Sequence, residues 1–146
     1  MNILVINGPN LNMLGIREPG IYGTETYEDL CKMIREKVSS LGGTVKCFQS
    51  NHEGAIIDEI QAAYGVYDGI VINPGAYTHY SYAILDALKA VSLPAEEVHI
   101  SDIRARESFR AVSVTAEACI AQIAGEGMMG YIQAIDMLWK QKNLLK

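Results

Sequence analysis

The sequence predicts an α/β protein in which a parallel five-stranded sheet is covered by helices on both faces. Two observations lead to this prediction. Short runs rich in Val and Ile alternate with longer stretches whose apolar residues recur at helical spacing, and Gly or Pro ends several of these segments. Because strand and helix alternate strictly, we expect helices to join successive strands, which then run parallel.

Each element has its own signal. Residues 2–8, NILVING, form a short β-branched run before Pro9, as expected for a buried parallel strand. The stretch 26–43 has apolar residues at helical spacing and a weak capping box of Thr26 and Asp29 at its start. The other predicted strands are 44–50, 68–75, 96–102 and 118–125, and the other predicted helices are 52–65, 81–91 and 131–145.

Five strands joined in this way fit the flavodoxin-like order 2-1-3-4-5, a three-layer sandwich that would place residues 1–146 in one domain. In such sheets the ligand binds outside the carboxyl ends of the strands. Polar residues, including all three histidines, gather at these predicted ends. They are Asn7, Asn10, Asn12, Ser50, Asn51, His52, Glu53, Asn73, Thr78, His79, Glu97, His99, Ser101 and Asp102.

Composition and charge argue against several classes of protein. The net charge of −5 and the absence of a basic run disfavour broad binding to nucleic acid or to anionic membranes. Cys31, Cys47 and Cys119 lie far apart in the sequence, so we expect small apolar residues in a reducing compartment. Met1 leads directly into the first strand, and no apolar run reaches the roughly 20 residues that span a bilayer. We expect a soluble cytoplasmic protein.

Several chemistries lack the residues they need. No lysine stands at a strand end to form a Schiff base, and no HxxE, HxH or CxxC spacing suggests a metal site. The run 125–130, GEGMMG, fits a dinucleotide fingerprint, but too little chain follows for the second strand and its acidic residue. We expect these glycines to form a tight turn before the last helix, and we predict neither cofactor nor metal.

The fourth predicted strand carries the most informative pattern. Side chains alternate across a strand, so Glu97, His99 and Ser101 share one face. A carboxylate two residues before a histidine could orient the imidazole and hold it protonated. The alternative is a half-exposed edge strand with ordinary polar residues. A parallel strand buried on both faces should be apolar throughout, which favours the functional interpretation.

The segment 17–23, REPGIYG, places a fixed cation near a phenol. Pro19, Gly20 and Gly23 predict that it is not a helix interior. A guanidinium about 4 Å from a phenol oxygen contributes roughly 4 kcal/mol at an effective dielectric constant of about 20. Lowering a tyrosine pKa by two units requires about 2.7 kcal/mol. Arg17 could therefore make Tyr22 a usable base; a solvated arginine beside a surface tyrosine is the alternative.

Seven motifs follow one another along nearly the whole chain. They are INGPNLNMLG, REPGIYG, FQSNHEG, INPGAYTHYS, EVHIS, ARESFR and GEGMMGY. Together they resemble the type II 3-dehydroquinate dehydratases. The resemblance implies a flavodoxin-like fold and removal of water from 3-dehydroquinate to give 3-dehydroshikimate, without metal or organic cofactor. It also implies a place in the shikimate route to aromatic amino acids or in quinate breakdown.

The resemblance assigns catalytic roles to residues that match the motifs. Tyr22, as a tyrosinate, would take a proton from the carbon next to the ketone, and Arg17 would lower the pKa of the phenol. A water held near Asn10 would stabilise the enolate. His99 resembles the general acid that protonates the departing hydroxyl, with Glu97 as its orienting partner.

The resemblance also implies the substrate contacts. Asn73, the Ile100 and Ser101 backbone amides and the Ser101 hydroxyl would form the carboxylate site. His79 and Arg110 would bind the ring hydroxyls.

Assembly is expected from the same resemblance. Asp86 matches the residue that reaches the site of a neighbouring subunit, in a homo-oligomer expected to be a dodecamer built from trimers. A buried Asp86 would need a partner, and a solvent-facing aspartate is the alternative. Asp102 and Arg104 depart from the Asn and His that the family mostly has. We expect these departures to change loop charge and affinity rather than reaction type.

Two other functions stay open at this stage. One is a flavodoxin-like binding module for small anions or nucleotides. The other is a different cofactor-free lyase or isomerase acting on a polyhydroxy carboxylate. Substitution of Tyr22 by Phe separates the first from an enzyme, and a substrate screen separates the second.

Overall fold

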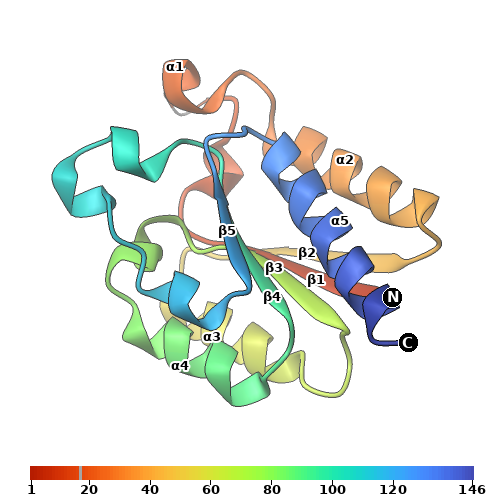
Figure 1. Ribbon diagram of the computed structural model, residues 1–146. Coiled ribbons are helices and arrows are strands. Elements are labelled where there is room, and N and C mark those ends of the chain that lie inside the picture. Colours follow the sequence, from red (N-terminus) through yellow and green to blue (C-terminus); the bar gives the residue numbers. More distant parts are fainter. Residues whose placement is uncertain (17) are drawn as a thin grey trace.

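The computed structural model describes residues 1–16 and 18–146, apart from the side chain of Tyr22. All five strands run parallel in the order β2-β1-β3-β4-β5, which confirms the predicted fold class (Figure 1). The strands are β1 (Asn2–Asn7), β2 (Thr44–Gln49), β3 (Gly69–Asn73), β4 (Ala95–His99) and β5 (Ala121–Ala124). The helices are α1 (Pro19–Tyr22), α2 (Tyr27–Ser40), α3 (Glu53–Ala62), α4 (Tyr82–Val91) and α5 (Met129–Leu144).

Helices cover both faces of the sheet, α2 and α5 on one and α3 and α4 on the other (Figure 1). Alternate residues of the central strands supply the two cores, as the period of two requires. Ile3 and Val5 pack into the core under α2 and α5, while Leu4 and Ile6 pack into the core under α3 and α4. All four side chains are fully buried.

Local signals explain where α2 begins. Thr26 Oγ1 accepts a hydrogen bond from the Asp29 amide at 3.1 Å, and Asp29 Oδ2 accepts one from the Thr26 amide at 2.9 Å. This pair is the capping box that the sequence suggested. Among the described residues, no helix is long and apolar enough to cross a membrane.

The structure departs from the sequence predictions in two segments. Pro19–Tyr22 forms one helical turn, α1, where we expected no helix. The turn is possible because proline at the first helical position lacks an N–H that would be unpaired there anyway. The segment between β4 and β5 folds into three 3-10 helices that the sequence did not reveal. They are η3 (Ile103–Ala105), η4 (Ser108–Arg110) and η5 (Thr115–Ala118).

Two further 3-10 helices follow the carboxyl ends of strands, η1 (Leu11–Met13) after β1 and η2 (Gly75–His79) after β3. The alternative interpretation of the fourth strand is wrong, because β4 lies between β3 and β5 and all five of its residues are buried. Its polar residues therefore face packed structure rather than solvent.

Candidate active site

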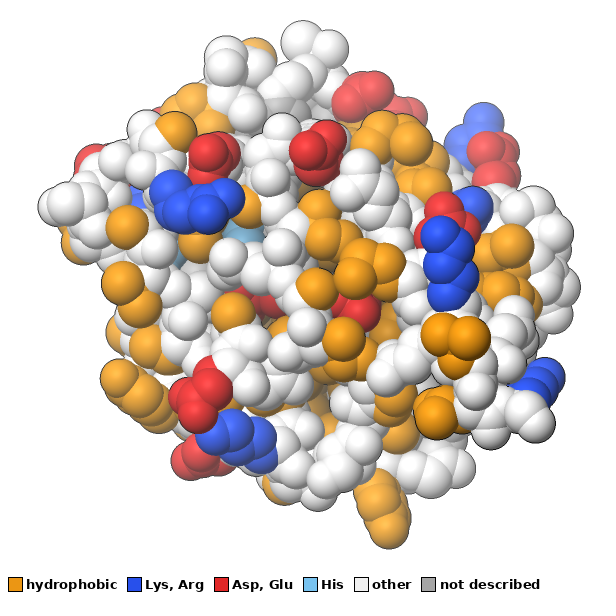
Figure 2. Space-filling model, in the orientation of Figure 1, with side chains coloured by type: hydrophobic (Ala, Val, Ile, Leu, Met, Phe, Trp, Pro, Cys, Tyr) orange, Lys and Arg blue, Asp and Glu red, His pale blue; other side chains and the backbone are white. Residues whose placement is uncertain are grey.

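A cavity lies at the carboxyl ends of the strands, where the fold class predicts a ligand. Residues that follow β1, β3 and β4 form most of its wall, and η3 and η4 supply the rest. In Figure 2, histidine atoms lie close to a group of basic side chains over the 103–118 segment at the upper left. The polar residues of the wall are Asn10, Asn73, His79, His99, Ser101, Arg106 and Arg110.

Asn10 takes a backbone conformation that few side chains tolerate. Its φ of 68° lies in the left-handed region, where Asn is among the least disfavoured residues after Gly. The Asn10 amide donates to Asn51 Oδ1 at 3.0 Å, and Gln49 Nε2 donates to the same oxygen at 3.1 Å. The end of β2 thus holds the loop after β1 in a strained position, as often occurs at functional sites.

The Asn73 amide has a fixed orientation at the end of β3. Its Nδ2 donates to the Tyr131 hydroxyl at 2.9 Å, and its Oδ1 accepts from the Gly75 amide at 3.1 Å. The Tyr131 hydroxyl in turn donates to Asn7 Oδ1 at 2.6 Å. Burial raises the pKa of Tyr131, so the phenol stays neutral and keeps this donor. One Nδ2 hydrogen of Asn73 remains for a ligand.

The His79 ring is oriented by the 111–114 segment. Its Nδ1 lies 2.7 Å from the Val112 carbonyl oxygen. A carbonyl oxygen only accepts, so Nδ1 carries the hydrogen. In the neutral ring Nε2 is then an acceptor, available to a hydroxyl group in the cavity.

His99 and Glu97 form the contact that the strand pattern predicted. His99 Nε2 lies 2.9 Å from Glu97 Oε2, with exposed fractions of 4% and 0% for the two residues. Burial raises the pKa of Glu97, but the hydrogen bond and charge of His99, with hydrogen bonds from Thr115 and Gln122, lower it to about 2. Glu97 is therefore ionised, and its carboxylate fixes the orientation of the His99 ring.

A glycine turn holds the backbone that follows His99. The Gly125 amide donates to the carbonyl oxygens of His99 at 3.3 Å and Ser101 at 3.2 Å, and the Gly127 amide donates to that of Ile100 at 3.1 Å. Both glycines have positive φ, 82° and 59°. A Cβ at Gly130 would lie 3.1 Å from Val98 Cγ1. The expected tight turn before the last helix is thus confirmed, the helix packs closely at Gly130, and the turn fixes the peptides that border the cavity.

These features can be compared with those of known proteins. The family model described as dehydroquinase class II matches residues 1–139. The chain belongs to the class II dehydroquinase family. A 3-dehydroquinate dehydratase of Clostridium acetobutylicum is 60% identical over 145 residues, 99% of this chain and 99% of that protein. One of Caldicellulosiruptor bescii is 62% identical over 137 residues, 93% of this chain and 94% of that protein.

Solved structures agree with this membership. The type II dehydroquinase of Butyrivibrio crossotus has a TM-score of 0.93 and 64% identity, covering 94% of this chain and 97% of its own. That of Propionibacterium acnes has a TM-score of 0.92 and 45% identity, covering 95% and 96%. The resemblance seen in the sequence motifs is confirmed.

The structure brings together most of the residues expected for a class II dehydroquinase site. Asn10, Asn73, His79, His99, Ile100, Ser101 and Arg110 border one cavity, and Glu97 contacts His99 behind the wall. Arg17 lies outside the described residues, as does the side chain of Tyr22, so their predicted contact stays a prediction. Asp86 is exposed on α4 and does not line the cavity. In the isolated chain Asp86 therefore faces solvent, which was the alternative to a buried aspartate with a partner.

Sequence reasoning missed two residues of this candidate site, one in the cavity wall and one behind it. Arg106 lines the cavity, and its guanidinium lies 4.0 Å from carboxylate oxygens of Glu18 and Glu107. Tyr131 was counted only as part of the last helix, although a buried tyrosine usually finds a partner for its hydroxyl. Among the described residues, no three His, Cys, Asp or Glu side chains come together as a metal site would require.

Proposed function

We propose that the protein removes water from 3-dehydroquinate to give 3-dehydroshikimate, as a hydro-lyase without cofactor. Membership of the class II dehydroquinase family supports this activity. The observation that carries it is the buried His99–Glu97 pair in the wall of a cavity that also presents Asn73, His79 and Arg110. An acid, an amide donor, a ring acceptor and a cation are the groups that a polyhydroxy carboxylate requires.

His99 is the general acid of the proposed reaction. Its Nε2 is committed to Glu97, so Nδ1 is the nitrogen available for the cavity. The ionised carboxylate favours the imidazolium form before the reaction. Nδ1–H then protonates the hydroxyl group that leaves as water, and Glu97 keeps the ring in one orientation.

Tyr22 is the proposed base, and its tyrosinate takes the proton next to the ketone. Arg17 lies close to it in sequence, and a fixed guanidinium stabilises a phenolate. The proton loss gives an enolate, which a water held near Asn10 stabilises. The support for these roles is the match of REPGIYG and INGPNLNMLG to the family, together with the strained backbone of Asn10 at the cavity wall.

The remaining wall residues would bind the substrate. Its carboxylate would accept from the free Nδ2 hydrogen of Asn73, from the Ile100 and Ser101 amides and from the Ser101 hydroxyl. Its ring hydroxyls would donate to His79 Nε2 and accept from Arg110. Arg110 is anchored on the other side by Glu107, whose Oε2 lies 2.8 Å from Arg110 Nε.

The proposal extends to assembly, location and pathway. We expect one domain over residues 1–146 and a dodecamer built from trimers, in which Asp86 reaches the cavity of a neighbouring copy from its exposed position on α4. Size-exclusion chromatography with light scattering measures the assembly, and cell fractionation tests the expected cytoplasmic location. The pathway is shikimate biosynthesis or quinate breakdown.

Ultraviolet absorbance tests the activity directly, because 3-dehydroshikimate is a conjugated enone and 3-dehydroquinate is not. The protein should produce a rising signal with 3-dehydroquinate between pH 6 and 9. Tyr22→Phe and His99→Gln should each reduce kcat by about 100-fold or more, since each removes a proton-transfer group. Tyr64→Phe, at an exposed tyrosine, should leave kcat unchanged. Binding of 3-dehydroquinate without any enone would favour a binding module instead.

A further inference from the structure

Glu97 accepts hydrogen bonds from five side chains. Its Oε2 accepts from His99 Nε2 at 2.9 Å, Ser113 Oγ at 2.7 Å and Gln122 Nε2 at 2.7 Å. Its Oε1 accepts from Thr78 Oγ1 at 3.1 Å and, at short range, from Thr115 Oγ1. A carboxylate has about four lone-pair sites, so this one is saturated.

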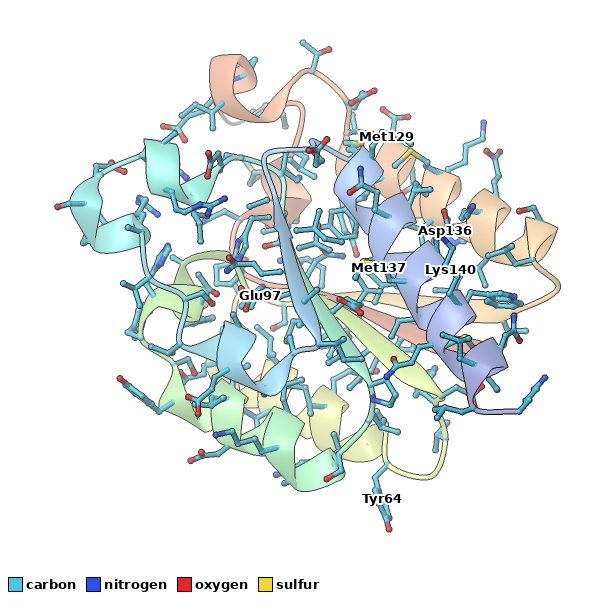
Figure 3. The ribbon with its side chains drawn as sticks, in the orientation of Figure 1. Tyr64, Glu97, Met129, Asp136, Met137 and Lys140 are labelled. Atoms are coloured by element: carbon cyan, nitrogen blue, oxygen red, sulfur yellow. The ribbon has the colours of Figure 1, made fainter. Side chains whose placement is uncertain are left out.

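Four of the five donors have no role in the proposed function. Thr78, Ser113, Thr115 and Gln122, the cradle, do not line the cavity. They are neutral and come from η2, from the segment entering η5, from η5 itself and from β5. Glu97 lies on the side of the sheet away from α5, where these elements meet (Figure 3). Their side-chain hydrogen bonds reach the cavity wall through Glu97 and His99.

The hydrogens of the cradle favour an ionised Glu97. Thr78 Oγ1 lies 2.6 Å from Ser113 Oγ and 2.8 Å from Thr115 Oγ1, and each of the three hydroxyls has one hydrogen. Ser113 and Thr115 direct theirs to Glu97. A protonated Glu97 oxygen would itself be a donor. Both oxygens already accept from donors, so protonation would break one of these contacts.

The segment 112–116 orients the His79 ring directly and contributes to the cradle around Glu97, which holds the His99 ring. Val114 donates its amide hydrogen to the Thr78 carbonyl at 2.8 Å, and Ala116 donates to Ser113 Oγ at 3.1 Å. The Val112 carbonyl holds His79, as described above. The 112–116 segment therefore fixes the cradle and the His79 ring as one unit.

We infer that Thr78, Ser113, Thr115 and Gln122 are positioning residues that keep Glu97 ionised and thereby set the orientation of His99. The kinetic part of this inference rests on the proposed function. The other titratable groups nearby place no charge beside Glu97. Burial raises the pKa of Cys119, which stays a neutral thiol. Glu96 lies on the opposite face of β4.

Carbon-13 NMR of the Glu97 carboxyl, assigned with Glu97→Gln, tests the inference without any turnover. In the unaltered protein this carbon should report a carboxylate from pH 4 to pH 8, since the pKa lies at about 2. Each lost hydrogen bond to the charge should raise the midpoint by about one pH unit. Thr115→Val combined with Gln122→Met should therefore raise the midpoint to about pH 4, so that half of Glu97 is protonated at the lower end of this range. Thr115→Ser keeps the hydroxyl and should titrate like the unaltered protein.

The kinetic readout separates positioning from simple damage. In the double variant kcat for enone formation should fall about twofold more between pH 7 and pH 4 than in the unaltered protein, because about half of Glu97 is protonated at a midpoint near pH 4. A merely structural loss would lower kcat by the same factor at every pH. Thr115→Ser should restore the original profile.

Three outcomes would overturn the inference. They are an unchanged Glu97 midpoint in the double variant, a uniform loss of kcat, and a Thr115→Ser profile that resembles Thr115→Val. If Thr115→Val does not fold, Gln122→Met with Ser113→Ala provides the same titration. Absence of enone formation in the unaltered protein would overturn the proposed function instead, and the NMR titration would still decide the role of the cradle.

Discussion

Glu96 is a buried carboxyl that the proposed chemistry does not use, and its replacement should change how stability depends on pH. It is 1% exposed and shares a sheet face with Val98, under α5. Its Oε2 has no hydrogen-bond partner among the described residues. Burial raises its pKa to about 7, opposed only in part by a hydrogen bond from the Ala121 backbone.

The size of the change in the free energy of unfolding follows from the pKa of Glu96 in the unfolded and in the folded protein. The carboxyl titrates at 4.5 in its ordinary state and at about 7 when folded. Between these values the folded state binds more protons than the unfolded state, so stability falls as pH rises through this window. The cost of the buried charge is about 1 kcal/mol at pH 5 and about 3 kcal/mol at pH 8.

Glu96→Gln removes the charge and should therefore gain stability relative to the unaltered protein as pH rises. This gain should be about 2 kcal/mol larger at pH 8 than at pH 5. Urea unfolding at both pH values and one fixed subunit concentration measures this difference. Comparing the two pH values cancels the cost of burying an amide. Glu36→Gln, at an exposed position on α2, should show no such change. An equal effect of Glu96→Gln at both pH values would refute the reasoning.

Substitutions at Gly8 and Thr26 test the close approach of β1 to β3 and the cap of α2. Gly8→Ala should lose about 3 kcal/mol in urea unfolding and reduce enone formation, because its Cβ would lie 2.4 Å from the Pro74 carbonyl oxygen and force apart the ends of β1 and β3. Gly54→Ala, with open space around it in α3, should be neutral or slightly stabilising in the same assay. Thr26→Ala should lose about 1 kcal/mol in urea unfolding, because it breaks the capping box of α2, whereas Thr26→Ser should lose much less; equal losses for Ala and Ser would argue against the cap.

The sequence predicted the fold because its signals are local. Runs of Val and Ile, helical spacing and Gly or Pro stops are all read within ten or twenty residues, and strict alternation then limits the topology. The contact of His99 with Glu97 was also accessible, since a period of two places both on one face of a strand. Asn73 and His79 followed from the rule that ligands bind at carboxyl ends.

Other parts of the site depend on contacts between distant segments. Asn7 and Tyr131 are 124 residues apart, and no local pattern shows that the Tyr131 hydroxyl meets Asn7 and Asn73. Ser113 precedes the short helix η5 and Thr115 begins it, in a stretch of sequence without helical or strand periodicity, so their convergence on Glu97 is a result of tertiary structure. The short helix α1 was missed because proline was read as a breaker rather than as a first residue.

Glu96 and Glu97 show most clearly the difference between what local sequence predicts and what tertiary contacts decide. They are neighbours on one strand and equally buried, yet the pKa is raised to about 7 in the first and lowered to about 2 in the second. Desolvation acts on both, so burial alone cannot cause the difference. The cause is what each carboxylate meets: the hydrogen bond and charge of His99 lower the Glu97 pKa most and further side-chain donors add to this, whereas Glu96 faces an apolar core and one backbone amide. The pKa values of the carboxyls on β4 are therefore decided by what covers each face, and a sequence that keeps Glu97 and His99 but loses the cradle should have a raised Glu97 pKa.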